Sequence, residues 1–189
     1  MIIVDDEAIS PEEAQAFSDM VLDWKGPQWV FTPVTNYVTE IGTATIDSNT
    51  TEAHQMVSMI GPNHPLRQTI VKMITKLTNK HGIKMREVGR IKLNLLTTSH
   101  ESSPDQYHMP HVDTDGVHNV FLYYLNDCDG DTFLFNETYS SGEVPDTYTI
   151  NQRISPKMGR CVMFSGEQYH ASSSPTKSAY RCILNVDFM

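Results

Sequence analysis

The segment QYHMPHVDTDGVHNVFLYYLND, residues 106–127, places His111 and Asp113 two positions apart, where a hydrophobic run begins. Side chains alternate between the two faces of a strand, so positions i and i+2 point the same way. An imidazole and a carboxylate would then converge on one point and could supply two ligands to a metal ion. Chance alone gives about one His-x-Asp or His-x-Glu in a chain of this composition, so the pair by itself is a weak indication.

A facial triad of two histidines and one carboxylate needs one more histidine, and it leaves coordination positions open for Fe(II) chemistry. His170 is the best candidate, because it lies between two strand-like segments that are distant in sequence from His111. The remaining histidines have contexts that favour helix ends, a polar loop or a solvated turn: His54, His64, His81, His100, His108 and His118.

Arg181 begins the otherwise apolar run RCILNVDF, a short distance after His170. An arginine that enters a core strand is costly unless it meets an anion. Its planar guanidinium suits a carboxylate, which it can bind through two parallel hydrogen bonds. Arg181 is therefore a candidate for binding an anionic group near the possible metal site.

The elements that would position these residues change in character along the chain. Residues 10–24 are predicted to be helical, with Ser10 and Glu13 as a capping box and apolar residues at helical spacing through Trp24. Residues 64–82 repeat this pattern. The stretch between them, from residue 29 to 47, indicates one or two strands.

From Gly89 onward the hydrophobic pattern has a period of two, which is typical of strands. Short strands at this spacing suggest a sandwich or barrel with the helices packed on one side. A long polar segment, residues 97–110, precedes His111, and we expect it, together with residues 139–147, to supply a lid. The expected strands are RIKLNLL, HNVFLYYL, DTFLF, TYTINQRI, RCVMFSG and RCILNVDF.

The bulk composition narrows the class of protein. A chain of 189 residues is most simply one domain, and a net charge of −9 argues against nucleic acid as the main partner. No apolar run is long enough to span a membrane, and no secretory signal is apparent. The three cysteines, Cys128, Cys161 and Cys182, are predicted to be reduced thiols that pack in strands. We therefore expect a soluble cytoplasmic protein.

Taken in order, these motifs resemble the prolyl-4-hydroxylase-like branch of the Fe(II)/2-oxoglutarate-dependent dioxygenases. The resemblance covers about residues 89–188 and rests on H-x-D, LYYLND, DGDTFLF, PKMGRCVMFSGEQYH and AYRCILNVDF. It implies a mainly β fold of the α+β class, a double-stranded β-helix (jelly roll) with N-terminal helices packed on one side. Residues 1–189 would form a single oxygenase domain, with 1–88 as helical support and outer strands and 89–189 as the jelly-roll catalytic core.

The resemblance also implies roles for single residues. His111, Asp113 and His170 would ligate Fe(II), Arg181 would bind the C5 carboxylate of 2-oxoglutarate, and Tyr124 would hydrogen-bond that same carboxylate. The sequence departs from the family pattern in places. The usual G-G-E-T reads DGDT, and the tyrosine commonly found three positions before the first ligand, here Tyr107, lies four before it.

The implied reaction uses O2 and 2-oxoglutarate to hydroxylate an unactivated C–H bond, with release of succinate and CO2 and with ascorbate as a possible support. The resemblance favours a peptidyl prolyl residue as substrate, and a free small molecule is the alternative. Two further classes stay open: a non-catalytic jelly-roll binding module, and a cupin-like metalloenzyme that does not use 2-oxoglutarate. The cupin-like alternative predicts no role for Arg181.

Overall fold

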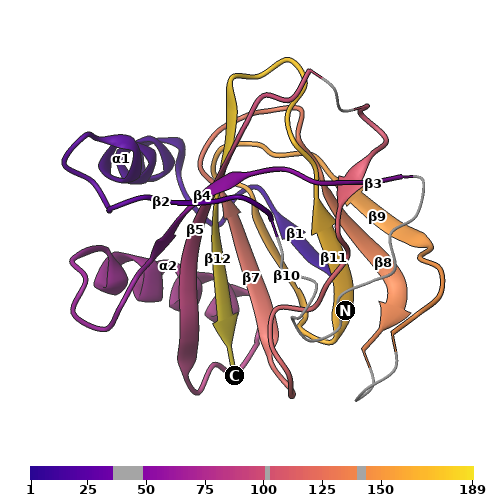
Figure 1. The fold of residues 1–189 in the computed structure, drawn as a ribbon. Coiled ribbons are helices and arrows are strands. Elements are labelled where there is room, and N and C mark those ends of the chain that lie inside the picture. Colours follow the sequence, from indigo (N-terminus) through magenta and orange to yellow (C-terminus); the bar gives the residue numbers. More distant parts are fainter. Residues whose placement is uncertain (36–48, 101–102, 140–143) are drawn as a thin grey trace.

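The computed structural model describes residues 1–35, 49–100, 103–139 and 144–189, and Figure 1 shows their arrangement. The helices are α1 (Pro11–Leu22) and α2 (Leu66–Lys80). The strands are β1 (Ile3–Asp5), β2 (Val30–Thr32), β3 (Thr50–Thr51), β4 (Gln55–Met59), β5 (Val88–Thr97), β6 (Tyr107–His108), β7 (Asn119–Tyr124), β8 (Thr132–Thr138), β9 (Ile150–Ile154), β10 (Cys161–Ser165), β11 (Gln168–Ser172) and β12 (Tyr180–Phe188).

The predicted start of the first helix is confirmed. The Ser10 hydroxyl accepts a hydrogen bond from the Glu13 backbone N–H at 3.2 Å, and the Glu13 carboxylate accepts one from the Ser10 N–H at 3.1 Å. The helix ends at Leu22, however, so the expectation that Trp24 belongs to its buried face is wrong. Trp24 lies beyond the C-cap residue Asp23 and is 86% exposed.

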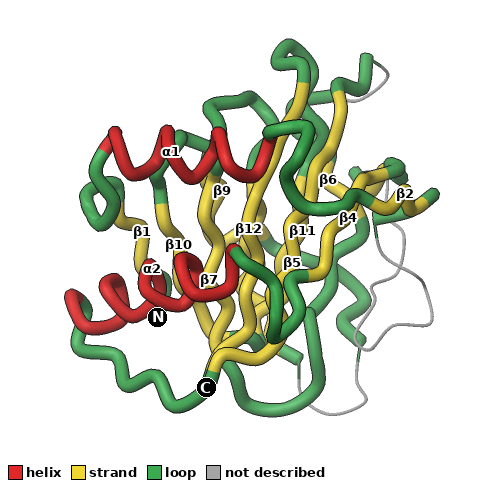
Figure 2. The backbone as a smooth tube through the Cα atoms, turned by 90° about the vertical axis from the view of Figure 1, so that its left-hand side faces the viewer, coloured by secondary structure: helices red, strands yellow, loops and turns green. Residues whose placement is uncertain are grey.

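A large antiparallel sheet carries both helices on one of its faces, as Figure 2 shows. Its strand order is β1-β10-β7-β12-β5-β4-β2, so β12 lies between β7 and β5. Strands from the first 88 residues therefore join the same sheet as those of the C-terminal half. The helices bury apolar side chains against this face, including Phe17 and Ile74 from the helices and Leu93, Tyr123 and Leu184 from the sheet.

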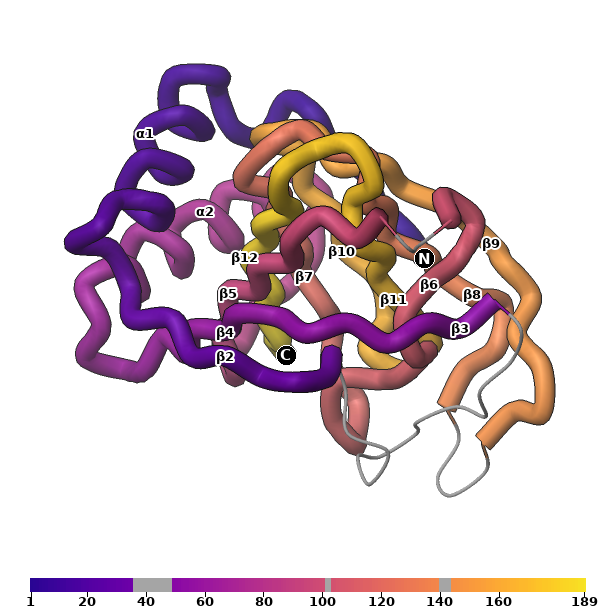
Figure 3. The backbone as a smooth tube through the Cα atoms, turned by 45° about the horizontal axis from the view of Figure 1, so that its top comes forward, coloured from indigo at the N-terminus to yellow at the C-terminus, as the bar shows by residue number. Residues whose placement is uncertain are grey.

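The opposite face of the large sheet meets a smaller sheet of order β11-β8-β9, and a second apolar cluster lies between the two. Leu122 and Ile183 from the large sheet and Leu134 and Ile154 from the small sheet belong to this cluster. Figure 3 shows the two sheets from above, with β11 and β8 on the side away from the helices. The expected mainly β jelly roll with helices on one side is confirmed.

All six expected strands of the C-terminal half are present, although β11, which holds His170, is a separate strand after β10. The expected packing role of the cysteines is confirmed for Cys161 and Cys182, which are buried, whereas Cys128 is only half-buried and lies outside a strand. Of the strand-like stretch 29–47, β2 is present, and residues 36–48 lie outside the described residues. No helix in the described parts of the chain is long and apolar enough to cross a membrane.

Candidate metal centre and pocket

The structure brings His111, Asp113 and His170 together. Their ligand-capable atoms all lie within 4.8 Å of one another. Asp113 Oδ1 is 3.8 Å from His111 Nε2, and Asp113 Oδ2 is 3.4 Å from His170 Nε2. The two histidines are held by an isolated antiparallel bridge, in which each backbone N–H donates to the other residue's carbonyl at 3.0 Å. This bridge, rather than one continuous strand, places the H-x-D pair.

The donor atoms of the triad fit a metal ion. His111 Nδ1 lies 3.0 Å from the Met109 carbonyl oxygen, and His170 Nδ1 lies 3.2 Å from that of Gln168. Because a carbonyl only accepts, each Nδ1 carries the hydrogen and each Nε2 keeps its lone pair. His170 Nε2 is buried and has no hydrogen-bond partner among the described residues. Two imidazole nitrogens and one carboxylate are the donor set of non-haem Fe(II) sites.

Burial and the neighbouring His170 together lower the pKa of His111 to about 3, so this imidazole is neutral. Asp113 has the opposite charge state. Burial opposes its ionisation, but the Arg90 guanidinium and the neighbouring His170 and His111 together outweigh burial and hold the pKa of Asp113 well below its usual range. The site therefore offers a neutral imidazole nitrogen at His111 and an ionised carboxylate at Asp113, which are the forms that bind metals.

A buried cluster of polar side chains fixes the position of the Asp113 carboxylate. Arg90 Nη2 lies 2.6 Å from Asp113 Oδ1, while Arg90 Nε donates to Asp187 Oδ2 at 2.9 Å. On the other side, Asn185 Nδ2 donates to Asp113 Oδ2 at 3.0 Å. Burial and the charge of Asp113 raise the pKa of Asp187, and Arg90 opposes them. Arg90 and Asp187 were not predicted from the sequence, where the only signal was a charged residue within each of two strand-like runs.

A narrow pocket of about 40 Å³ extends from the two histidines along the inner face of the large sheet. Alternate residues of β5 and β12 line it: Lys92, Asn94, Leu96, Arg181, Ile183 and Asn185. The register pairs Arg181 with Leu96, Ile183 with Asn94 and Asn185 with Lys92. Asn94 and Asn185 therefore face this cavity, which settles whether they point into it or into solvent.

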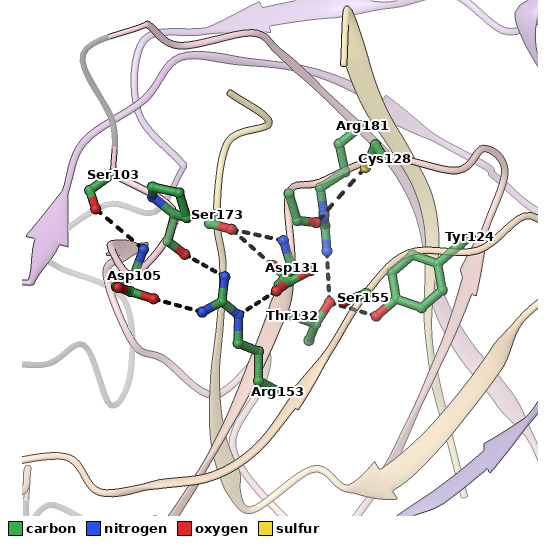
Figure 4. A network of polar contacts seen from close by, with 12 residues as sticks. Ser103, Asp105, Tyr124, Cys128, Asp131, Thr132, Arg153, Ser155, Ser173 and Arg181 are labelled. Atoms are coloured by element: carbon green, nitrogen blue, oxygen red, sulfur yellow. Dashed lines mark hydrogen bonds and ion pairs between the residues drawn. The ribbon is translucent and has the colours of Figure 1, made fainter. Parts of the chain in front are cut away.

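Arg181 lies at the end of the pocket away from Asp113 and is only 2% exposed. Its Nε donates to the Gly130 carbonyl at 2.8 Å, and its Nη2 donates to the Thr132 hydroxyl oxygen at 2.8 Å (Figure 4). The Tyr124 hydroxyl donates to the same Thr132 oxygen at 2.7 Å. Thr132 thus accepts two hydrogen bonds and keeps its own hydrogen to donate.

The two residues predicted to bind the cosubstrate, Arg181 and Tyr124, differ in whether they line the pocket themselves. Arg181 lines it together with His111 and His170, and so does Thr132, which the sequence analysis did not single out. Tyr124 reaches it only through the Thr132 hydroxyl. Burial raises the pKa of Tyr124, so its phenol stays protonated and can donate.

Two histidines were placed wrongly by their sequence context. His108, expected in a polar loop, lies in β6 and is 1% exposed, with its ring nitrogens 3.0 Å from the Ser172 hydroxyl and 3.1 Å from that of Ser174. His118, expected in a solvated turn, is also buried. Its ring lies where a Cβ on Gly166 would be, 2.1 Å from Nε2, so only glycine fits there.

The segment expected to form a lid is tied to the rest of the protein. The Arg153 guanidinium donates to Asp105 Oδ1 at 2.8 Å and to the Pro104 carbonyl at 2.5 Å, and it forms an ion pair with Asp131 (Figure 4). Residues 101–102 of this segment lie outside the described residues, as do residues 140–143 of the second expected lid segment. Lid function of either segment stays a prediction.

The two departures in DGDT have structural explanations. Asp131, in place of the family's glutamate, pairs with Arg153. Asp129, in place of its first glycine, accepts hydrogen bonds from the backbone N–H groups of Thr176, Lys177 and Ser178 and from the Thr176 hydroxyl. Asp129 thereby orders the loop that leads into β12 and Arg181.

Neither a protein-family model nor a curated protein sequence matches the chain. Solved structures do resemble its fold. An oxidoreductase of the 2OG-Fe(II) oxygenase family from Burkholderia pseudomallei superposes with a TM-score of 0.63 at 12% identity, covering 99% of this chain and 84% of that one. The non-haem α-ketoglutarate-dependent epimerase SnoN from nogalamycin biosynthesis gives a TM-score of 0.53 at 11% identity, covering 95% and 84%. At these identities the likeness shows a shared fold.

Proposed function

We propose that this protein is an Fe(II)- and 2-oxoglutarate-dependent dioxygenase that hydroxylates an unactivated C–H bond. One observation carries the proposal: two histidines and one aspartate converge on one point, and the two histidines line a narrow pocket together with a buried arginine. The triad provides the ligands for iron, and the arginine provides a partner for the far carboxylate of the cosubstrate. Both structural neighbours are named for 2-oxoglutarate (α-ketoglutarate), and the first is named for Fe(II) as well, which supports the proposal.

Each residue has a defined part in this reaction. Bound at His111, Asp113 and His170, Fe(II) would supply O2 activation coupled to the oxidative decarboxylation of 2-oxoglutarate to succinate and CO2. Arg181 would bind the C5 carboxylate, and the Thr132 hydroxyl would donate to it. Tyr124 would act at one remove, because its hydrogen bond holds Thr132 in the donating orientation.

Apolar side chains between the two ends of the pocket would exclude water from the reacting groups. Leu96, Leu122 and Ile183 line the stretch between Arg181 and the histidines. A pocket lining that excludes water lowers the local dielectric constant and so strengthens the electrostatic attraction between Arg181 and a carboxylate. It also limits side reactions of the oxidant. The protein thus supplies orientation and shielding, while the metal and cosubstrate supply the oxidising chemistry.

The resemblance in sequence nominates a peptidyl prolyl residue as the substrate, and a net charge of −9 favours basic or neutral peptides. A free small molecule is the second candidate, and the epimerase named among the structural neighbours belongs to an antibiotic biosynthesis. A cytoplasmic location is part of the same proposal.

Succinate formation tests the proposed reaction. Purified protein is incubated with Fe(II), ascorbate and 2-oxoglutarate, and the slow turnover that occurs without substrate is followed. The wild type should release succinate, His170→Ala should release none above background, and His54→Ala, a change at an exposed histidine, should match the wild type. Equal succinate from the wild type and His170→Ala would overturn the oxygenase assignment.

Arg181→Lys separates the cosubstrate assignment from the metal assignment. Lysine keeps the positive charge but lacks the planar guanidinium, so the KM for 2-oxoglutarate should rise about 10–100-fold. Arg86→Lys, at an exposed arginine, is the matched control and should leave this KM unchanged. An unchanged KM in Arg181→Lys would favour the cupin-like alternative, in which Arg181 has no role.

A further inference from the structure

Two asparagines lie side by side on the inner wall of the pocket. Asn94 belongs to β5 and Asn185 to β12, and both line the cavity beside His111 and His170. Because Asn94 is paired with Ile183, two positions from Asn185, the asparagines are diagonal neighbours on one face of the sheet. Side chains in this relation are close enough to contact one small ligand.

The orientation of the Asn94 amide follows from a chain of hydrogen bonds that starts at the backbone. Gln55 Nε2 donates to the Thr35 carbonyl oxygen at 2.8 Å, and a carbonyl can only accept. The Gln55 oxygen therefore faces Asn94 and accepts from Asn94 Nδ2 at 2.7 Å. This leaves Asn94 Oδ1 buried without a hydrogen-bond partner among the described residues.

The Asn185 amide is oriented in the same way by a different acceptor. The Asp113 carboxylate forms an ion pair with Arg90 through Oδ1, and its Oδ2 accepts a hydrogen bond from Asn185 Nδ2 at 3.0 Å. Within the described residues, Asn185 Oδ1 is then a second buried acceptor with no donor. Thr35 Oγ1 is a third buried polar atom on the pocket wall that lacks a partner in the described chain.

The cosubstrate cannot satisfy these two amide oxygens. At neutral pH 2-oxoglutarate presents two carboxylates and a keto oxygen, all of which are acceptors. A buried acceptor without a donor is unfavourable, and the substrate is the remaining component of the proposed reaction. A prolyl ring within a peptide has no N–H or O–H, so in a prolyl substrate the donors to these oxygens would have to come from another group of the same molecule.

We infer that the substrate carries a primary carboxamide, which would bind the oxygens of Asn94 and Asn185 through its NH2 group. The two N–H bonds of one NH2 group can serve two acceptors, whereas a hydroxyl has only one hydrogen. The carboxamide carbonyl would accept from the Thr35 hydroxyl. Arg181 and Lys92 line the same pocket, and their positive charges disfavour an ammonium or guanidinium group there. This inference rests on the proposed function, since it places the carboxamide beside the metal triad.

Proton relaxation of small probes tests the inference without requiring the natural substrate. The protein is loaded with Co(II) as a paramagnetic stand-in for iron and saturated with 2-oxoglutarate. Methyl relaxation is then measured for acetamide and for acetone, which has a similar shape but no N–H. Acetamide should relax faster than it does with the Zn(II)-loaded protein, and acetone should not. Asn94→Leu should weaken acetamide binding about 10-fold, the value of one lost hydrogen bond.

Asn63→Leu, at an exposed asparagine, is the matched control and should leave acetamide binding unchanged. Equal relaxation of acetone and acetamide, or unchanged acetamide binding in Asn94→Leu, would each overturn the carboxamide assignment. Failure of the proposed function is distinguishable, because it appears as absent succinate formation and absent Co(II) binding, whereas failure of this inference changes only the relative relaxation of the probes.

Discussion

Consecutive residues of β12 face two different environments. Cys182, Leu184, Val186 and Phe188 belong to the apolar core beneath the helices. Ile183 and Asn185 face the pocket together with Arg181, and Asp187 lies on the same side of the strand, paired with Arg90. The helix side contains groups that need no partner, whereas the pocket side contains polar groups with specific partners. One face of β12 therefore packs in the core and stabilises the fold, while the other face carries residues of the proposed site.

The difference extends to individual atoms. On the helix side the buried side chains are mostly apolar and closely packed, so the loss of one of them leaves a cavity. On the pocket side, Arg90 holds Asp113, and Gly130 and Thr132 accept hydrogen bonds from Arg181, while His170 Nε2 and the amide oxygens of Asn94 and Asn185 have no partner among the described residues. Buried polar atoms without partners are typical of sites that bind a ligand. This contrast can be tested by substitutions on each face.

The largest expected effect is on stability and comes from the helix side. Leu93 and Asn94 are consecutive in β5 but face opposite sides, and Leu93 is fully buried. Leu93→Ala should reduce the free energy of unfolding by about 2–5 kcal/mol, because it leaves a cavity. Asn94→Ala should cost about 1 kcal/mol or less, since it removes one hydrogen bond together with an unpaired acceptor. Urea denaturation measures both, and equal costs would contradict the division of the sheet into two faces.

A second effect concerns metal affinity. Arg90→Gln removes the cation that holds Asp113 and leaves two carboxylates close together, so Co(II) or Fe(II) affinity should fall about 10–100-fold. Isothermal titration calorimetry measures the affinity. The double variant Arg90→Gln/Asp187→Asn removes both charges and should recover stability but not metal affinity. Full recovery of affinity would show that Arg90 only neutralises Asp187 and does not position Asp113.

A third effect concerns the cosubstrate end. Thr132→Val should raise the KM for 2-oxoglutarate about 10-fold, because it removes a hydroxyl that meets both Arg181 and the pocket. Tyr124→Phe should raise it only a few-fold, since Tyr124 acts through Thr132. Steady-state succinate kinetics give both values, and kcat should change little. A larger effect for Tyr124→Phe than for Thr132→Val would reverse the assigned order.

The smallest effect is a pH dependence of stability at Asp129. Burial opposes its ionisation, but hydrogen bonds from Ser178 and Thr176 outweigh burial and lower the pKa of Asp129 below its usual range. A lowered folded-state pKa stabilises the protein above the unfolded pKa of about 4, and this contribution is lost as the pH falls further. Asp129→Asn should therefore lower the urea midpoint at pH 7 more than at pH 3. An equal change at both pH values would exclude the carboxylate charge as the cause.

Part of the site could be predicted from the sequence because its signals are local. The spacing of His111 and Asp113, the position of His170 between strands and the arginine at the start of β12 are visible without coordinates. The two placements that failed, His108 and His118, followed polar surroundings in sequence. Their burial depends on Ser172, Ser174 and Gly166, which are distant in the chain. A polar context does not reveal partners that folding supplies.

The sequence by itself determined the alternation that gives each strand two unlike faces, the capped first helix and the candidate ligands, because these depend on the geometry of neighbouring residues. The tertiary structure alone decided that Arg90 and Asp187 hold Asp113, that Thr132 stands between Tyr124 and Arg181, and that Gln55 orients Asn94. All but the Tyr124–Thr132 contact join residues that are far apart in the chain, so they depend on strand register and on how the two sheets meet. The direction of each hydrogen bond is determined only when the two partners come together in the folded protein. That direction decides which polar atoms stay available to bind a ligand.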